Sequence, residues 1–255
     1  TAVWLAAGGL ANDRGGASGR LCCTFMSVGH GAAVLLEMPD GSVMLYDAGC
    51  LDAPQIGARG IAACLWEKRI SAIDAIIISH GDTDHFNAVP ELLRRFPTER
   101  VYVTPGMFDS VLGAIRHFRD VLGRHRIPSS ELVAGDRFRV GEATIEVLHP
   151  PSSFSGESDN AGSLVLAVEY QGRRILLPGD LEGMGMETLL AVRPLPCDVL
   201  LAPHHGSWRS DSAGLAAWCS PLLVVVSGHR DPRQTAVEDA YRQVGAELIY
   251  TGECG

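Results

Sequence analysis

The sequence predicts an α/β fold of four layers, an αββα sandwich in which two β-sheets pack face to face and helices cover both outer faces. Each half of the 255-residue chain begins with short strand patterns and ends with helical ones, as expected when helices cover packed sheets. No Pro- or Gly-rich linker separates the halves, so we assign residues 21–255 to one domain. Residues 1–20, with a stretch rich in Gly, Ala and Asn, are predicted to be a lead-in or linker.

The first half combines apolar runs of strand length with segments of helical periodicity. Pro39-Asp40-Gly41 supplies a turn between two of the strands. Val111, Ile115, Phe118 and Leu122 recur at helical spacing. The predicted strands are 21–27, 33–38, 42–46 and 75–79, and the predicted helices are 56–67, 88–95 and 107–124.

The second half begins with four strand patterns and then alternates between helices and strands. Such alternation is typical of parallel strands joined by helices. The first four predicted strands are 137–140, 144–148, 163–170 and 174–177. The alternating part consists of helix 185–192, strand 198–202, helix 212–219, strand 222–227, helix 236–244 and strand 247–250.

The strongest chemical signal is a cluster of two histidines and two acids directly after a buried strand. The segment reads His80-Gly81-Asp82-Thr83-Asp84-His85 and follows the apolar run that ends at Ser79. Imidazole and carboxylate are the side chains that bind divalent metals, and a tight loop can direct several of them at one point. The segment therefore predicts a metal-binding loop.

Other predicted strands also deliver Asp or His where they end. One such acid alone is typical of a turn, but five strand ends of this kind together indicate a rim of metal ligands. The side chains concerned, besides the loop itself, are Asp47, Asp180, the pair His204 and His205, and His229.

These motifs resemble the metallo-β-lactamase superfamily, whose loop signature is H-x-H-x-D-H and whose fold is an αββα sandwich with a dinuclear metal site. The resemblance covers the chain from about Leu21 onward. Within that superfamily the chain is most similar to the C-terminal domain of ComEC, the DNA-uptake channel protein of natural competence. Four stretches carry this similarity: Val28-Gly29-His30-Gly31-Ala32-Ala33 (similar to V-G-Q-G-D-A), Asn160-Ala161-Gly162-Ser163-Leu164-Val165-Leu166, Leu177-Pro178-Gly179-Asp180-Leu181-Glu182, and Pro203-His204-His205-Gly206-Ser207.

The resemblance implies a role for each matching residue. One metal is expected on Asp84, His85 and His229, and the other on His80 with help from Asp82. Asp180 is expected to bridge the two metals, and Asp47 to orient the loop by hydrogen bonding to a ligand. His204 and His205 then lie beside the site, where one of them contacts substrate. The alternative, with His205 as the last ligand and His229 as a loop residue, stays open.

The chain departs from the family pattern in three places. Asp82 replaces the second histidine of the loop, Asp159 and Asn160 stand where a third-motif histidine is expected, and Ala32 replaces an acid. The first two changes leave oxygen donors at one metal position, which favours Mn²⁺ or Mg²⁺ over Zn²⁺. Asp159 and Asn160 are possible contacts to metal or substrate. We therefore expect two divalent ions, with the first weakly held. His149, before Pro150, is interpreted as a structural histidine.

Such a site predicts a metal-dependent hydrolase of the phosphodiesterase or nuclease type. Two divalent ions lower the pKa of a bridging water, and the resulting hydroxide, oriented by Asp84, attacks phosphorus while His204 or His205 helps to balance charge. The resemblance implies DNA as the substrate, specifically the strand that is not taken up in competence. Two alternatives remain: a small-molecule phosphodiesterase, esterase, lactonase or β-lactamase of the same fold, and a catalytically degenerate binding domain.

The charge pattern bears on the expected partner. A net charge of −9 argues against binding DNA by overall electrostatics. However, residues 94–139 hold nine arginines and five acids, so this stretch could line a path to the metals, or it could be a solvated helix face. We expect weak, metal-dependent binding of DNA, and of single strands in particular. The resemblance also implies a piece of a longer membrane-channel protein at the extracytoplasmic face of a bacterial membrane, without a membrane span in this sequence.

Overall fold

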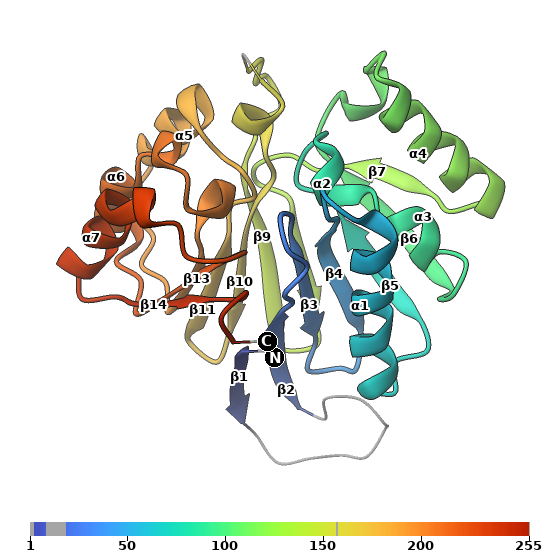
Figure 1. Cartoon of the computed structure of the whole chain (residues 1–255), viewed down its shortest axis with the longest axis horizontal. Helices are drawn as coiled ribbons and strands as arrows, with labels where there is room; N and C mark the ends of the chain where they lie inside the picture. The colour runs from blue at the N-terminus through green and yellow to red at the C-terminus, as the bar shows by residue number, and fades with distance from the viewer. Residues whose placement is uncertain (1–2, 9–18, 157, 255) are drawn as a thin grey trace.

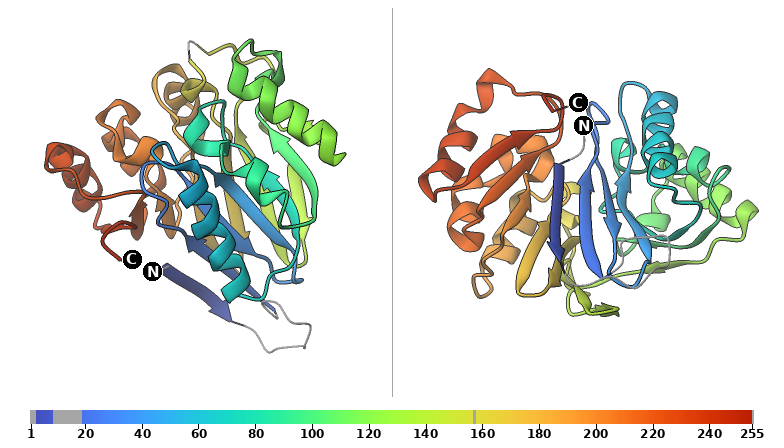
Figure 2. Two further views of the ribbon diagram at one scale, coloured as in Figure 1. Left: turned by 45° about the vertical axis from the view of Figure 1, so that its right-hand side comes forward. Right: turned by 90° about the horizontal axis from the view of Figure 1, so that it is seen from below.

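The computed structural model of the protein describes residues 3–8, 19–156 and 158–254. Its strands form two seven-stranded sheets, with helices on the outside of each (Figure 1). This is the α/β sandwich of four layers that the sequence predicts. Two further views show the same division, with the first sheet and its helices on one side and the second sheet and its helices on the other (Figure 2).

The first sheet has the strands in chain order, and its direction changes halfway. The first three pairings, from β1 to β4, are antiparallel, and those from β4 to β7 are parallel. The carboxyl ends of β4 and β5 therefore lie side by side at one edge of the sheet. The strands are β1 (Val3–Gly8), β2 (Arg20–Phe25), β3 (Ala33–Glu37), β4 (Val43–Ala48), β5 (Ile73–Ile77), β6 (Thr98–Val103) and β7 (Ser129–Glu131).

The second sheet repeats this plan. Strands β8 to β11 pair antiparallel, and β11 to β14 pair parallel. The carboxyl ends of β11, β12 and β13 are thus neighbours. The strands are β8 (Arg137–Val140), β9 (Ala143–His149), β10 (Val165–Tyr170), β11 (Arg173–Leu177), β12 (Val199–Leu201), β13 (Leu223–Val226) and β14 (Glu247–Tyr250).

Three apolar clusters hold the layers together. The central one lies between the sheets and includes Phe25, Leu36, Tyr46 and Leu166, all almost completely buried. The outer face of the first sheet packs against the helices α1 (Pro54–Glu67), α2 (Thr83–Phe86), α3 (Val89–Leu92) and α4 (Gly113–His125). The outer face of the second sheet packs against α5 (Gly183–Leu190), α6 (Ser212–Cys219) and α7 (Thr235–Gln243). Each α-helix therefore buries one face against a sheet, as a layered domain requires.

The structure differs from the predicted elements at several points. The segment assigned to a lead-in contains β1, so the first sheet begins at Val3 instead of Leu21, and the rest of that segment lies largely outside the described residues. Strands β6 and β7 and the short helix α2 were not predicted. The helix predicted over 107–124 is divided into a 3-10 turn, Met107–Asp109, and α4. Among the described residues no helix is long and apolar enough to cross a membrane.

Candidate metal centre

The metal loop lies where the two sheets come together. Ser79 and His80 lie just after β5, with one residue between its end and Ser79, and their side chains are fully buried. Opposite them lies Gly179, just after β11, with a φ of +58°, where a Cβ would lie 2.7 Å from Ser79 Cβ. Only glycine allows the two strand ends to approach this closely. The sheet geometry therefore brings Asp180 onto the loop that carries the histidines.

Asp47 reaches the loop through a β-bulge. In the pairing of β3 with β4, Ala33 lies opposite Ala48 and Val34 opposite Tyr46, which leaves Asp47 as the extra residue, with a φ of 56°. Bulges redirect a side chain in this way. The fully buried Asp47 carboxylate accepts hydrogen bonds from the backbone N–H and the hydroxyl of Ser79, at 2.7 and 2.8 Å. It also lies 2.8 Å from His85 Nδ1.

This network fixes which nitrogen of each imidazole faces the site. His85 Nδ1 donates to the Asp47 carboxylate, so in the neutral ring Nε2 carries the lone pair. Because the Ser79 hydroxyl donates to Asp47, it can accept from His80 Nδ1, at 2.9 Å. His80 Nε2 then also presents a lone pair. Asp47 thus contacts His85, a candidate ligand, and Ser79 extends the same hydrogen-bond network to His80.

His80, His85 and Asp180 form a buried group whose donor atoms lie close enough to hold one cation. His85 Nε2 lies 3.3 Å from Asp180 Oδ1, and the two imidazole rings lie 4.2 Å apart. Both Nε2 atoms are buried and lack any hydrogen-bond partner among the described residues. Buried polar atoms are normally satisfied, so a metal ion is the partner that this geometry fits.

The charges in the site point the same way. Asp47, Asp84 and Asp180 are all less than a tenth exposed, and the ion pairs that the described residues form with them involve only histidines. Burial of Asp180 would raise its pKa, but the neighbouring His85 and His205 hold that pKa well below its usual range. Burial likewise opposes protonation of His85, yet Asp180 and Asp47 hold its pKa well above its usual value. A cation bound between these imidazoles and buried carboxylates would compensate the negative charge of the carboxylates.

A second group lies at the solvent side of the first and consists of His30, Asp84 and His205. Asp84 Oδ2 lies 3.7 Å from His30 Nε2 and 3.6 Å from His205 Nε2. His205 Nε2 also lies 3.7 Å from Asp180 Oδ2. Asp180 thus has one carboxylate oxygen directed toward each group, which is the arrangement expected of a bridging ligand.

The turn that carries His204 and His205 is strained. Both residues have positive φ angles, 48° and 54°, and each such non-glycine residue costs about 1–2 kcal/mol. Strain of this kind is concentrated at functional sites. His204 Nδ1 lies 2.9 Å from Glu182 Oε2, and Glu182 Oε1 accepts from the Asn160 side chain. Glu182 therefore turns His204 Nε2 toward Asp180, 3.9 Å away.

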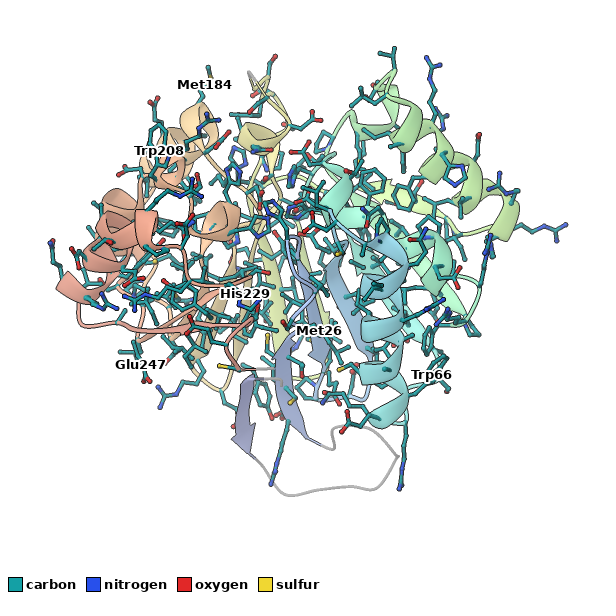
Figure 3. All side chains as sticks on the ribbon, in the orientation of Figure 1. Met26, Trp66, Met184, Trp208, His229 and Glu247 are labelled. Carbon is teal, nitrogen blue, oxygen red and sulfur yellow. The ribbon has the colours of Figure 1, made fainter. Side chains whose placement is uncertain are left out.

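The structure does not bring His229 to either group. His229 is exposed on the loop after β13, beside the C-terminal strands (Figure 3). A Cβ on Gly252 would lie 2.7 Å from its Nδ1, so its ring rests against the end of the chain past β14. The strained turn instead places His205, the alternative last ligand, beside Asp84 and Asp180.

The remaining predicted residues lie around the rim. Asp82 is half-exposed, with Oδ2 3.5 Å from His80 Nε2. Asp159 is exposed and lies over Gly81, while Asn160 contacts Glu182. His149 is buried, with Nδ1 3.0 Å from the Ser163 carbonyl, and burial lowers its pKa. His149 therefore lies in neither ligand group, as its structural interpretation predicts.

The structure assigns the candidate ligands to the two metals differently from the expectation based on the sequence. The sequence pairs His85 with Asp84 and leaves the first position to His80 and oxygen donors. In the structure His85 faces His80 and Asp180, so the buried group has two imidazoles. Sequence reasoning missed His30, Ser79 and Glu182 as members of the site. His30 stands in the V-G-Q-G-D-A-like stretch, and a histidine in place of glutamine is the signal that could have found it.

A cavity of about 390 Å³ opens beside the metal loop. Gly81 forms part of its wall, as do Phe154, Ser158 and Asp159. Residues before α4 and at its start, including Met107, Ser110 and Ile115, line the other side. The cavity beside the metal loop therefore has room for a ligand much larger than a water molecule.

Fold and site together define a metal-binding protein of the αββα class. A family model described as "Metallo-beta-lactamase superfamily" matches residues 26–229, and the chain belongs to that superfamily. Its relatives with curated names include competence proteins.

The relatives with curated names are longer proteins. ComE operon protein 3 of Bacillus subtilis (strain 168) is 25% identical over 253 residues, covering 85% of this chain and 32% of the relative. Competence protein ComA of Neisseria gonorrhoeae is 29% identical over 242 residues, covering 91% and 31%. The chain thus spans about a third of the length of these relatives.

Solved structures share the fold at lower identity. The metallo-beta-lactamase fold protein YhfI from Bacillus subtilis superposes with a TM-score of 0.58 at 14% identity, covering 89% of this chain and 94% of that one. Zn²⁺-bound PqqB from Methylobacterium extorquens has a TM-score of 0.58 at 15% identity, covering 87% and 85%. These likenesses support the fold.

Proposed function

We propose that this domain is a dinuclear metal-dependent phosphodiesterase that cleaves DNA, as a nuclease acting on single strands. The observation that carries the proposal is the pair of adjacent ligand groups that share Asp180. Two cations held a few ångströms apart can stabilise the attacking and the leaving oxygen of a phosphodiester at the same time. Similarity to competence proteins supports DNA as the substrate.

The proposed ligands are His80, His85 and Asp180 for the buried ion, with Asp82 at its edge, and Asp84 and His205 for the outer one. Imidazoles mixed with carboxylates suit Zn²⁺ and Mn²⁺, and the number of carboxylates also admits Mg²⁺. When bound, the ions supply Lewis-acid activation of water and of the phosphoryl oxygens.

The chain's own residues then position the water and the substrate and transfer protons. Asp84 is buried at the solvent side of the site, where its free carboxylate oxygen can orient a water for attack on phosphorus. His204, held by Glu182 through Nδ1, presents Nε2 to the site and is placed to contact the phosphoryl group or protonate the leaving oxygen. Asp47 and Ser79 keep His80 and His85 in the required tautomers.

The surroundings fit a strand of nucleic acid. The cavity beside Gly81 has room for a nucleotide. It shares Ser110 with a second cavity of about 520 Å³, which Arg116 and Arg119 of α4 line together with Asp109 and Asp120. Other arginines of the basic stretch are neutralised, for example Arg95 by Glu91 and Arg137 by Glu146. We propose that the α4 arginines, rather than the whole stretch, guide the backbone toward the metals.

The proposed setting is that of the competence relatives. The domain would act as a part of a longer membrane protein, on the extracytoplasmic side, and degrade the strand that is not taken up. Because the net charge is −9, DNA binding is expected to be weak until the cations are bound.

A single comparison of substrates tests the proposal. Purified protein is offered single-stranded DNA, bis-p-nitrophenyl phosphate, a lactone and a β-lactam, each with Mn²⁺, Zn²⁺ or Mg²⁺, beside an Asp84→Asn variant. We expect DNA cleavage that requires metal and Asp84. Cleavage of only the small diester would reassign the substrate, lactone or lactam turnover would reassign the bond, and no turnover with any metal would leave a binding domain.

A further inference from the structure

The turn that carries His30 is fixed against the metal loop. Gly31 has a φ of +149°, and a Cβ there would lie 2.5 Å from the Gly49 carbonyl oxygen and 2.8 Å from that of Asp84. The Ala32 N–H donates to the Asp84 carbonyl, and the Ser227 hydroxyl donates to the Gly31 carbonyl at 2.6 Å. Both sheets therefore hold this turn in place, so the position of His30 is set by the fold.

The His30 side chain faces the outer ligand group. Its Nε2 lies 3.7 Å from Asp84 Oδ2, and its ring lies 5.0 Å from the ring of His205. Within the described part of the chain no hydrogen bond engages the His30 ring. A histidine–carboxylate pair that is 55% exposed on the histidine side gains little by itself. The ring nevertheless lies beside His205, whose buried Nε2 has no hydrogen-bond partner among the described residues.

We infer that His30 is a ligand of the outer cation, which it holds together with Asp84 and His205. Two imidazoles and one carboxylate, each offering one atom within 4.8 Å of the others, form a three-ligand site that leaves positions open for water or substrate. This inference deepens the proposed function and rests on it, since it assigns a ligand and an exchange property to one of the two cations.

The position of His30 makes the two cation sites unequal. The side chains of His80 and His85 are fully enclosed, whereas that of His30 is more than half exposed. In the buried site His80 and Asp180 follow β5 and β11, and Asp47 and Ser79 support the imidazoles by hydrogen bonds. In the outer site His30 lies in a loop and His205 in a short 3-10 turn. The outer cation should therefore exchange with solvent, and the buried one should be retained through dialysis.

Equilibrium dialysis tests this assignment. Wild type, His30→Gln and the control His117→Gln, which makes the same change on the exposed face of α4, are stripped with chelator and dialysed against graded Zn²⁺. Bound zinc per chain is counted by plasma mass spectrometry, and Co²⁺ absorption reports the coordination. We expect two ions of unequal affinity in wild type and in His117→Gln. In His30→Gln the weaker site should lose at least about tenfold in affinity while the stronger is unchanged.

The outcomes separate the inference from the proposed function. Two ions bound with unchanged affinities in His30→Gln would overturn the inference, even if that variant bound DNA less well. A single ion in wild type would also overturn it. Loss of the weaker site in His30→Gln, in a protein that cleaves no phosphodiester, would support the inference and remove the proposed function.

Discussion

The two ligand groups differ in their burial and in the residues that support them. His80, His85 and Asp180 are buried and supported by Asp47 and Ser79, whose hydrogen bonds determine the tautomers. His30, Asp84 and His205 lie nearer the solvent, with His30 exposed, and two of the three are carried by a glycine turn and by a strained turn. One group is therefore enclosed and backed by buried hydrogen bonds, whereas the other is open to solvent on the His30 side.

The largest effect is expected where the two groups meet. Asp180→Ala removes the carboxylate that faces both, so both cations should bind weakly and the rate of phosphodiester cleavage should fall by about 10³-fold or more. Metal counts and kcat on the purified variant check this. Asp239→Asn, an exposed acid on α7, is the matched control. If Asp180→Ala kept both ions, the groups would not share a ligand.

Two histidine substitutions distinguish the possible last ligands. His205→Ala should remove the outer cation and lower kcat/KM by about 100-fold, because it deletes a side chain in contact distance of Asp84 and Asp180. His229→Ala should leave metal content unchanged and the rate within about twofold, since His229 rests against Gly252. The reverse result would restore His229 to the site.

The hydrogen bonds that support the buried group can be weakened without replacing any of its ligands. Asp47→Asn keeps the size of the side chain but removes the charge that faces His85 Nδ1. Affinity for the buried cation should fall by about 10- to 100-fold, while the outer site changes less. Metal titration followed by Co²⁺ absorption measures the two sites separately. An equal loss at both sites would mean that Asp47 supports the whole edge.

The smallest effect on the site is expected from Glu238, which anchors the segment after His229. It is buried, and hydrogen bonds from Arg230 together with Tyr250 and Arg242 lower its pKa to about 2. Glu238→Gln should lower the free energy of unfolding at pH 7 by about 2 kcal/mol, without changing metal content.

The pH dependence of this effect follows from the sign of the shift. Because the folded pKa is depressed below the ordinary 4.5, the ionised Glu238 stabilises the fold above about pH 4.5, and its contribution fades as the pH falls toward 2. Urea unfolding of wild type and variant across this range measures it. A difference that stayed constant with pH would contradict the charge assignment.

Much of the fold was predictable because its signals are local. Strand and helix patterns predicted the two packed sheets, and the acids and histidines at the strand ends predicted the metal edge. Strand β6 was missed because in its sequence, Thr98–Val103, two adjacent charged residues, Glu99 and Arg100, interrupt the strand pattern, and β7 has only three residues, all exposed. Short exposed strands acquire their structure from pairing rather than from their own pattern.

The site was predicted less completely than the fold, because side-chain contacts depend on distant parts of the chain. His205 lies close to Asp84 because His204 and His205 both have positive φ angles, and no sequence pattern predicts such a turn. His30 is separated from Asp84 by three strands and α1. The choice between His205 and His229 needed the position of each strand end in the sheet.

Anomalous diffraction from crystals grown with Mn²⁺ or Zn²⁺ tests the central claim most directly. We predict two peaks, one among His80, His85 and Asp180 and a weaker one among His30, Asp84 and His205. After a brief soak with chelator only the second peak should disappear. A single peak, or a peak coordinated by His229, would contradict the account.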